Sequence, residues 1–217
     1  DNRNGFSFGI ALASKTFKNM NQEQVWNSIA ESWNNFRQKP SEELKDLNWK
    51  KGKLIDIGCG NCRNLISFKN IELYGIDFSE EMIKQANKFC EKHNMKVDIK
   101  KADMRKIPFK NNFFDYCLCL ASLHHINKVD ANEVLNEIYR IIKKEGQCLI
   151  SVWNKYPRFI FRKKETYISW KKKDRIYQRY YYLYNYFELR KLLLKNNFKI
   201  IKSGNIFEKN ITFLIQK

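Results

Sequence analysis

Residues 53–62 read Lys-Leu-Ile-Asp-Ile-Gly-Cys-Gly-Asn-Cys, and residues 73–79 read Leu-Tyr-Gly-Ile-Asp-Phe-Ser. The first stretch is an apolar run that ends in Gly58 and Gly60, and the second is an apolar run that ends near Asp77. This pattern predicts a buried strand, a tight glycine turn, and a second strand with a carboxylate at its carboxyl end. Such an arrangement is typical of the first half of a doubly wound α/β sheet.

The two glycines and Asp77 are suited to a ligand that carries a ribose. Glycine has no side chain, so the backbone at Gly58 and Gly60 can turn sharply and approach a ligand closely. Asp77 is placed to accept hydrogen bonds from two ribose hydroxyls. A dinucleotide motif expects a third glycine about three residues further on, where this chain reads Arg63-Asn64. The pattern therefore indicates an adenosine-containing cofactor and disfavours a nicotinamide dinucleotide.

Apolar runs and helical periodicity alternate along the rest of the chain. They predict strands near residues 53–58, 71–76, 96–101, 113–120 and 146–153, helices near 62–69, 79–93, 129–144 and 186–196, and closing strands near 198–203 and 209–216. The short turn between the closing strands predicts an antiparallel hairpin. The expected fold class is α/β, a three-layer sandwich around a mostly parallel seven-stranded sheet with an antiparallel strand in the C-terminal hairpin.

The length of 217 residues is enough for one domain that buries a full core without disulfides or metal. We expect residues 1–19 to be an extension foreign to the natural chain, Met20 to be the original start, and residues 20–217 to be one domain. No apolar run approaches the roughly 18 residues of a membrane span, so we expect a cytoplasmic protein with no membrane contact.

The six cysteines are scattered along the chain, and only Cys59 and Cys62 form a Cys-x-x-Cys pair. A structural zinc site needs a full tetrahedral ligand set, and no second pair or histidine cluster completes one. The sequence therefore predicts buried free thiols and no metal.

Positive charge is concentrated in the last third of the chain. The whole chain has a net charge of +18, and residues 151–217 contain 17 basic and 4 acidic residues, a local net charge of +13. An insertion at about 154–184 alternates basic and aromatic side chains, which suits phosphates and unpaired bases. The residues predicted to bind RNA are Lys163, Lys164, Lys171, Lys172, Lys173, Arg175, Tyr180 and Tyr181. A solvated lid over a small molecule is the alternative.

The cofactor-binding pattern resembles that of the class I S-adenosylmethionine-dependent methyltransferases, although Cys62 stands where that family usually has a third glycine. The segments 101–109 and 113–125 are similar to the family's third-strand exit and fourth strand. The resemblance implies S-adenosylmethionine as the cofactor, with Asp103 accepting from the adenine amino group and Met82 and Met104 flanking the ring. The implied cofactor-binding residues are Asp56, Gly58, Cys59, Gly60, Asp77, Phe78, Met82, Asp103, Met104 and Leu120.

Three segments are similar to one subfamily, the tRNA methyltransferases that esterify 5-carboxymethyluridine at the wobble position, including the methyltransferase part of the AlkB-homologue fusions. They are residues 25–40, residues 123–126 (Leu-His-His-Ile) and residues 178–184 (Gln-Arg-Tyr-Tyr-Tyr-Leu-Tyr). Ile126 departs from the subfamily's aromatic residue, and Ile-Thr-Phe after Asn210 departs from its tryptophan-rich ending. The resemblance runs from about Val25 to the end of the chain and implies the tRNA anticodon arm as a partner.

A carboxylate acceptor fits the lack of an obvious catalytic base. Its pKa lies near 4, so it is ionised and nucleophilic at neutral pH, and transfer requires mainly positioning and removal of water. We expect Arg37 and Arg179 to orient the acceptor carboxylate or neighbouring phosphates. We expect His124 or His125 to donate a hydrogen bond to the carboxylate or the uracil, unless the ring is tied structurally to backbone carbonyls.

The opening helix carries an apolar stripe, which we expect to pack against the sheet, with Arg37 emerging near the cofactor cleft. The stripe consists of Trp26, Ile29, Ala30, Trp33 and Phe36. Two other functions remain open: methylation of a small-molecule acceptor, and RNA binding without catalysis. The glycine motif and its two acids, Asp77 and Asp103, argue against RNA binding without catalysis. The basic aromatic insertion argues against a small-molecule acceptor.

The third strand, residues 96–100, is expected at a sheet edge, where an unpaired strand invites another one. The resemblance implies a small zinc-binding activator protein that adds a strand there. Lys96, Lys100 and Lys101 are the alternative explanation, because edge lysines also protect a strand from unwanted pairing.

Overall fold

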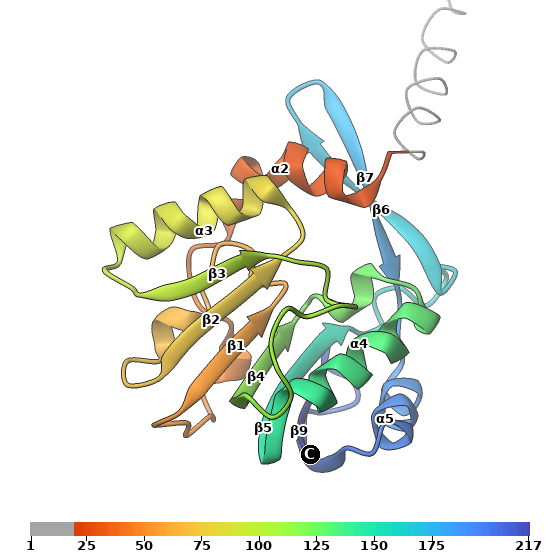
Figure 1. Cartoon of the computed structure of the whole chain (residues 1–217). Coiled ribbons are helices and arrows are strands. Elements are labelled where there is room, and N and C mark those ends of the chain that lie inside the picture. The colour runs from red at the N-terminus through yellow and green to blue at the C-terminus, as the bar shows by residue number, and fades with distance from the viewer. Residues whose placement is uncertain (1–19) are drawn as a thin grey trace, which may run out of the picture.

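The computed structural model describes residues 20–217, and the expectations for residues 1–19 lie outside the described residues. A seven-stranded sheet forms the centre of the described chain, in the order β3-β2-β1-β4-β5-β9-β8 (Figure 1). Its strands are β1 (Lys53–Ile57), β2 (Glu72–Asp77), β3 (Val97–Lys101), β4 (Phe114–Leu120), β5 (Ile142–Trp153), β8 (Lys199–Ser203) and β9 (Asn210–Gln216). Strands β1 to β5 are parallel, and β9 is antiparallel to both β5 and β8. The predicted fold class is confirmed.

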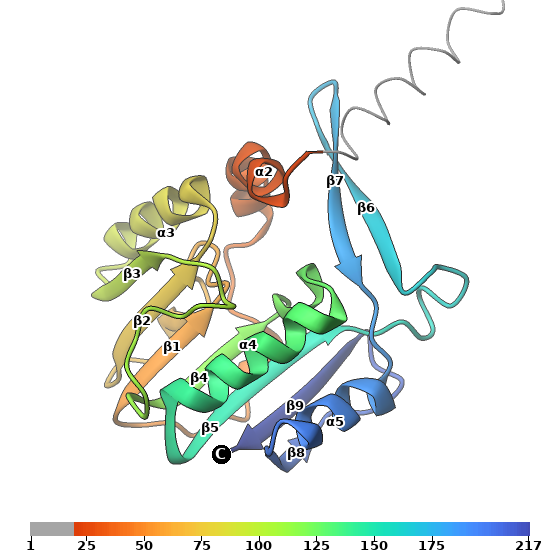
Figure 2. The ribbon, with the colours of Figure 1, turned by 45° about the vertical axis from the view of Figure 1, so that its right-hand side comes forward.

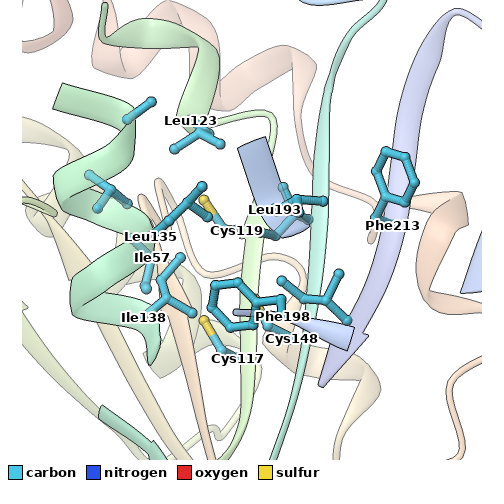
Figure 3. Close-up of a cluster of buried hydrophobic side chains, with 14 of the residues drawn as sticks. Ile57, Cys117, Cys119, Leu123, Leu135, Ile138, Cys148, Leu193, Phe198 and Phe213 are labelled. Carbon is cyan, nitrogen blue, oxygen red and sulfur yellow. The ribbon is translucent and has the colours of Figure 1, made fainter. Parts of the chain in front are cut away.

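Helices lie on both faces of the sheet. Helices α4 (Lys128–Ile141) and α5 (Tyr186–Lys195) cover one face, where their apolar residues meet side chains such as Ile57, Cys117 and Cys148 (Figure 3). Helix α3 (Glu80–Lys92) covers part of the other face together with the segment around Trp49. The alternation of strand side chains explains the two clusters, because neighbouring residues point to opposite faces. All six cysteines are free and buried, as predicted.

Three local expectations are corrected. The helix expected near 62–69 is only a turn and the short 3-10 helix η2 (Leu65–Ser67). Cys62 has a φ of 63°, a left-handed conformation that cannot continue an α-helix. Helix α2 (Gln22–Phe36) buries its apolar stripe against α3 and the strand β7, not against the main sheet. Phe36 at its end is 71% exposed.

The basic insertion folds into a second, two-stranded sheet. Strands β6 (Glu165–Lys172) and β7 (Arg175–Tyr182) form an antiparallel hairpin that projects from the main sheet beside α2 (Figure 2). The Gln22 amide group pairs with the β7 backbone by donating to Gln178 O and accepting from Tyr180 N–H. Trp170 Nε1 also donates to Ser32 Oγ at 2.9 Å. Helix α2 and the hairpin therefore pack as one unit over the carboxyl ends of the strands.

Among the helices of residues 20–217, none is both long and apolar enough to cross a membrane.

Candidate active site

A cavity of about 570 Å³ lies between the carboxyl ends of the central strands, helix α2 and the hairpin. This is where open α/β sheets bind their ligands. The predicted site residues that line it are Gly58, Cys59, Gly60, Asp77, Phe78, Met82, Asp103, Met104, Leu120, Arg37, His124, His125, Arg179, Tyr180 and Tyr181. Segments that are distant in the sequence therefore meet at one site.

The glycine turn requires its glycines. The backbone N–H groups of Gly58 and Cys59 both donate to the carbonyl oxygen of Ile76, at 2.8 and 2.9 Å, which ties the turn to β2. Gly58 has a φ of 70°, and a Cβ built on it would lie 2.5 Å from Ser122 Oγ. Gly60 has a φ of 55° and approaches the ring of Trp33. A larger residue at Gly58 would strain the backbone and collide with the cavity wall.

Asp77 organises the turn from the end of β2. Its Oδ2 accepts from Gly60 N–H at 3.0 Å, and its Oδ1 accepts from Ser79 N–H at 2.9 Å. The side chain is buried, and burial raises the pKa of Asp77 to about 6 although these hydrogen bonds favour the ionised form. Asp77 therefore has a structural role in addition to its predicted contact with ribose.

Asp56 lies behind the cavity wall instead of in it. It is fully buried and does not line the cavity, and its Oδ2 has no hydrogen-bond partner in residues 20–217. Burial raises the pKa of Asp56 to about 7, while Arg63 and Asn64 favour its ionised form. Asp56 therefore lies behind the glycine turn. The prediction that it binds the cofactor is corrected, because it does not reach the cavity.

Asp103, predicted to meet adenine, lies at the acidic end of the cavity beside Asp130 and Glu165. Arg105 binds it through Nε at 3.1 Å and Nη2 at 2.6 Å, and Arg105 Nη1 also reaches Asp130 at 2.8 Å. The Arg105 hydrogen bonds lower the pKa of Asp103, so its carboxylate remains an acceptor.

The two histidines present different groups. His124 Nδ1 accepts from the backbone N–H of Trp153 at 3.0 Å, so the neutral ring carries its proton on Nε2. His125 Nδ1 lies 3.0 Å from the carbonyl oxygen of Tyr180 and must donate to it, so its Nε2 is an acceptor. Burial lowers the pKa of both rings, that of His125 to about 3. Only His124 can therefore serve as the predicted donor.

Arg179 is a buried cation without an anion. It is 6% exposed, its Nε has no hydrogen-bond partner in residues 20–217, and no carboxylate of those residues pairs with it. Its guanidinium lies 5.0 Å from the ring centre of Trp170 and 5.4 Å from that of Tyr181. Burial and the neighbouring Arg37 lower the pKa of Arg179. The aromatic rings hold this charge at the cavity without neutralising it.

The predicted RNA-binding residues divide into two groups. Lys171, Lys173 and Arg175 are exposed at the hairpin tip, and Lys163 is exposed in the loop before β6. Lys172 Nζ is bonded to Ser28 O at 2.7 Å, and Lys164 is paired with Glu188. Tyr180 forms part of the cavity wall.

Tyr181 is not available to stack on a base. It is 1% exposed, and its ring packs against those of both His124 and Trp153, with centroid distances of 5.0 and 4.6 Å. The prediction that Tyr181 binds RNA bases is therefore corrected. The alternation of basic and aromatic residues along β7 did not show which of these side chains face the cavity and which face solvent.

Several lining residues were missed by the sequence reasoning, among them Arg63, Ser122, Asn127 and Trp153. Trp153 ends β5 and Ser122 follows β4, so their position just past a strand was an available signal. No such signal existed for Arg63, because its position depends on the turn around Cys62, where the sequence predicted a helix.

The lining fits S-adenosylmethionine. Two positive-φ glycines leave a space that side chains would fill, and a carboxylate stands at the end of β2 for the ribose. Asp103, just past the neighbouring strand β3, suits the adenine amino group, with Met82, Met104 and Phe78 as apolar contacts. The cavity volume lies in the range of small-molecule sites, roughly 300–1,000 Å³.

Comparison with known proteins agrees with this site. A family described as a methyltransferase domain matches residues 55–150. The chain is 27% identical over 146 residues to the tRNA (carboxymethyluridine(34)-5-O)-methyltransferase alkbh8 of Xenopus tropicalis, a match that covers 65% of this chain and 22% of that protein. It is 31% identical over 136 residues to the tRNA (carboxymethyluridine(34)-5-O)-methyltransferase of Saccharomyces cerevisiae, covering 60% of this chain and 47% of that protein. The match thus spans less than half the length of either relative.

The solved structures agree in fold. A methyltransferase from Methanosarcina mazei that depends on S-adenosylmethionine superposes with a TM-score of 0.68 at 17% identity, over 82% of this chain and 98% of that one. The glycine turn, the acid that ends β2 and the matched domain lie in the same part of the fold. The chain therefore carries a methyltransferase domain over residues 55–150, takes S-adenosylmethionine as its cofactor, and resembles the class I S-adenosylmethionine-dependent methyltransferases, among them the tRNA carboxymethyluridine methyltransferases, in sequence.

Proposed function

We propose that this chain methylates the carboxylate of 5-carboxymethyluridine at the wobble position of tRNA, which produces a methyl ester. The observation that carries the proposal is the buried Arg179 guanidinium, which lines the cofactor cavity and has no carboxylate partner in residues 20–217. A buried charge is costly unless an opposite charge pairs with it. An anionic acceptor meets this need, and the names of the two relatives favour a carboxylate on RNA.

The chemistry asks the protein to orient the acceptor. The bound cofactor supplies an electrophilic methyl group. The acceptor carboxylate is already ionised at neutral pH, so no side chain has to remove a proton. This agrees with two histidines whose pKa values are lowered by burial. Arg179 and Arg37 orient the carboxylate, and His124 Nε2–H donates to the acceptor without quenching the attacking oxygen.

The acceptor is tested with two RNAs that differ in one group. One carries 5-carboxymethyluridine at the wobble position and the other the neutral 5-carbamoylmethyluridine. With labelled S-adenosylmethionine we expect label only in the first RNA, because the amide offers no carboxylate for Arg179. Equal labelling of both RNAs would refute the proposed acceptor. Methylation of small carboxylic acids in preference to RNA would support the small-molecule alternative.

The hairpin is proposed to hold the anticodon arm. Lys163, Lys171, Lys173 and Arg175 are exposed on or before it, and they neutralise phosphates without reading sequence. Such a substrate agrees with the expectation that the protein is cytoplasmic.

A small zinc-binding activator protein is proposed as the partner at β3. This strand ends the sheet, and Val97 and Ile99 are only partly buried. An open groove of about 900 Å³ runs beside it, between β2 and the end of α3. Ala102 N–H donates to Asp77 O at 3.0 Å, so by alternation the N–H of Ile99 points away from β2. A partner strand therefore finds free donors at this edge.

We expect Ile99→Pro to abolish binding of the activator while the chain still binds S-adenosylmethionine. Proline removes an outward N–H that the β2–β3 pairing does not use. Ile99→Val is the matched control, since it keeps the donor and the strand propensity. Co-expression followed by size-exclusion chromatography measures the complex. Full activity of the single chain on tRNA, with no gain from the activator, would overturn this proposal.

A further inference from the structure

A further hollow, distinct from the cofactor cavity and from the groove beside β3, lies on the sheet face opposite α4 and α5. This groove has a volume of about 1200 Å³. Leu149 and Ser151 of β5 and Thr212 and Leu214 of β9 form its floor. One wall is formed by residues 35–47, a segment that starts in the last turn of α2. The other wall is formed by the β8–β9 turn. The groove exists because α2 packs on α3 and β7 and leaves this part of the sheet uncovered.

The groove continues into the cofactor cavity. Five residues line both spaces: Arg37, Arg63, Leu120, Ala121 and Trp153. The Arg63 guanidinium also donates to the carbonyl oxygen of Lys39, which joins the glycine turn to the groove wall. A ligand lying in the groove can therefore extend to the reacting centre without leaving the protein surface.

The groove carries cations that the protein does not neutralise. Lys45 and Lys202 are paired with Glu42 and Asp46 at 2.7 and 2.6 Å. Within residues 20–217, the other basic side chains of the groove make no ion pair with a carboxylate; they are Arg37, Lys39, Arg63 and Lys209. Two acids of the groove also lack an ion pair: Glu43, whose carboxylate accepts hydrogen bonds from Ser41 and Asn210, and Glu208. The side chains of the groove that make no ion pair therefore carry a net positive charge.

An aromatic ring stands at the rim. Phe36 lines the groove, is 71% exposed, and touches Trp170 of β6 edge-on, with 5.9 Å between ring centres. The Phe36–Trp170 contact therefore joins the rim of the groove to the hairpin. Exposed rings and free cations along one channel are the combination that binds single-stranded nucleic acid.

We propose that this groove binds the unpaired nucleotides that flank the acceptor base of the RNA substrate. The inference rests on the proposed function for its substrate class. Phe36 stacks on one base, and Lys39 and Lys209 contact phosphates. The exposed Lys202–Asp46 pair, which bridges the two walls, contributes little stability and opens at small cost to admit the strand.

The test uses direct binding of a fluorescein-labelled single-stranded RNA heptamer, measured by anisotropy at several salt concentrations. We expect Phe36→Ala to weaken binding about 5- to 100-fold through the lost stacking. We expect Lys39→Ala combined with Lys209→Ala to reduce the salt slope by roughly 1.4, since each lost phosphate contact on a single strand removes about 0.7. Phe187→Ala and Lys88→Ala are matched controls, because Phe187 is 69% exposed on α5 and Lys88 is exposed on α3. Both controls should bind like the parent.

Three outcomes decide the proposal. If the groove variants lose heptamer affinity and the controls do not, the groove is an RNA site, even if no methylation of carboxymethyluridine is found. If tRNA is methylated but the groove variants bind the heptamer like the controls, the groove proposal is overturned while the proposed function stands. If Phe36→Ala changes the oligomeric state measured by light scattering and not the RNA affinity, the occupant is a second copy of the chain, which also overturns the proposal.

Discussion

Arg179→Met is expected to lower kcat/KM for the carboxymethylated RNA by about 30- to 3,000-fold, because removing one partner of a buried charge pair costs about 2–5 kcal/mol. The affinity for S-adenosylmethionine should stay unchanged, since we expect the glycine turn, Asp77 and Asp103 to hold the cofactor. The melting temperature should stay level or rise. Methionine keeps contact with the surrounding rings and removes the cost of burying an unpaired charge.

The control for this variant is Arg190→Met, which removes an exposed arginine on α5. Steady-state kinetics, calorimetry with the cofactor and thermal denaturation supply the three readouts. If Arg179→Met kept its activity on RNA, the acceptor site would lie elsewhere. If it lost cofactor affinity and activity together, Arg179 would belong to the cofactor site instead.

Asp77→Ala is expected to reduce S-adenosylmethionine affinity by roughly 150- to 25,000-fold, since two hydrogen bonds to a charged group contribute about 1.5–3 kcal/mol each. It should also destabilise the protein. The N–H groups of Gly60 and Ser79 lose their acceptor, at a cost of about 1–3 kcal/mol each if they stay buried. Asp77→Asn separates the two effects, because its single side-chain oxygen keeps part of the local bonding while the charge is lost.

The pH dependence gives an independent check on Asp77. Burial raises the pKa of its carboxyl to about 6, so the ionised acceptor is present above that pH and is lost as the pH falls below it. The cofactor affinity of the parent relative to Asp77→Asn should therefore fall between about pH 7 and pH 5. Titration calorimetry across this range measures the ratio. A constant ratio, or equal affinity of parent and Asp77→Ala, would remove Asp77 from the cofactor site.

The position of the first strands along the chain was predictable because the signals are local. The apolar run before Gly58 and the acid that ends β2 lie in short segments whose geometry depends little on the rest of the chain. The edge position of β3 has a different source, because it follows from the strand order that the resemblance implies. The cofactor end of the site was therefore accessible from sequence.

The part of the site that is proposed to hold the methyl acceptor is formed by contacts between residues distant in the sequence. Its geometry could therefore not be predicted from local sequence patterns. The inward face of β7 is set by α2, whose Gln22 pairs with Tyr180 across 158 positions of sequence, and this places Tyr181 inside the cavity wall. The tautomers of the two histidines depend on backbone groups of Trp153 and Tyr180. That Arg179 has no carboxylate partner in residues 20–217 is apparent only in the folded chain. Cys62 is a further case, because a cysteine in a left-handed turn gives no sequence signal.

The proposed reaction forms a methyl ester on the wobble uridine of tRNA. The most direct measurement is nucleoside mass spectrometry of carboxymethylated tRNA after incubation with methyl-labelled S-adenosylmethionine and the chain, with and without the co-expressed activator. We expect label only in the methyl ester of 5-carboxymethyluridine, released by mild alkali because an ester hydrolyses where N-methyl and C-methyl groups do not. Alkali-stable label in another nucleoside, or no label with either preparation, would contradict it.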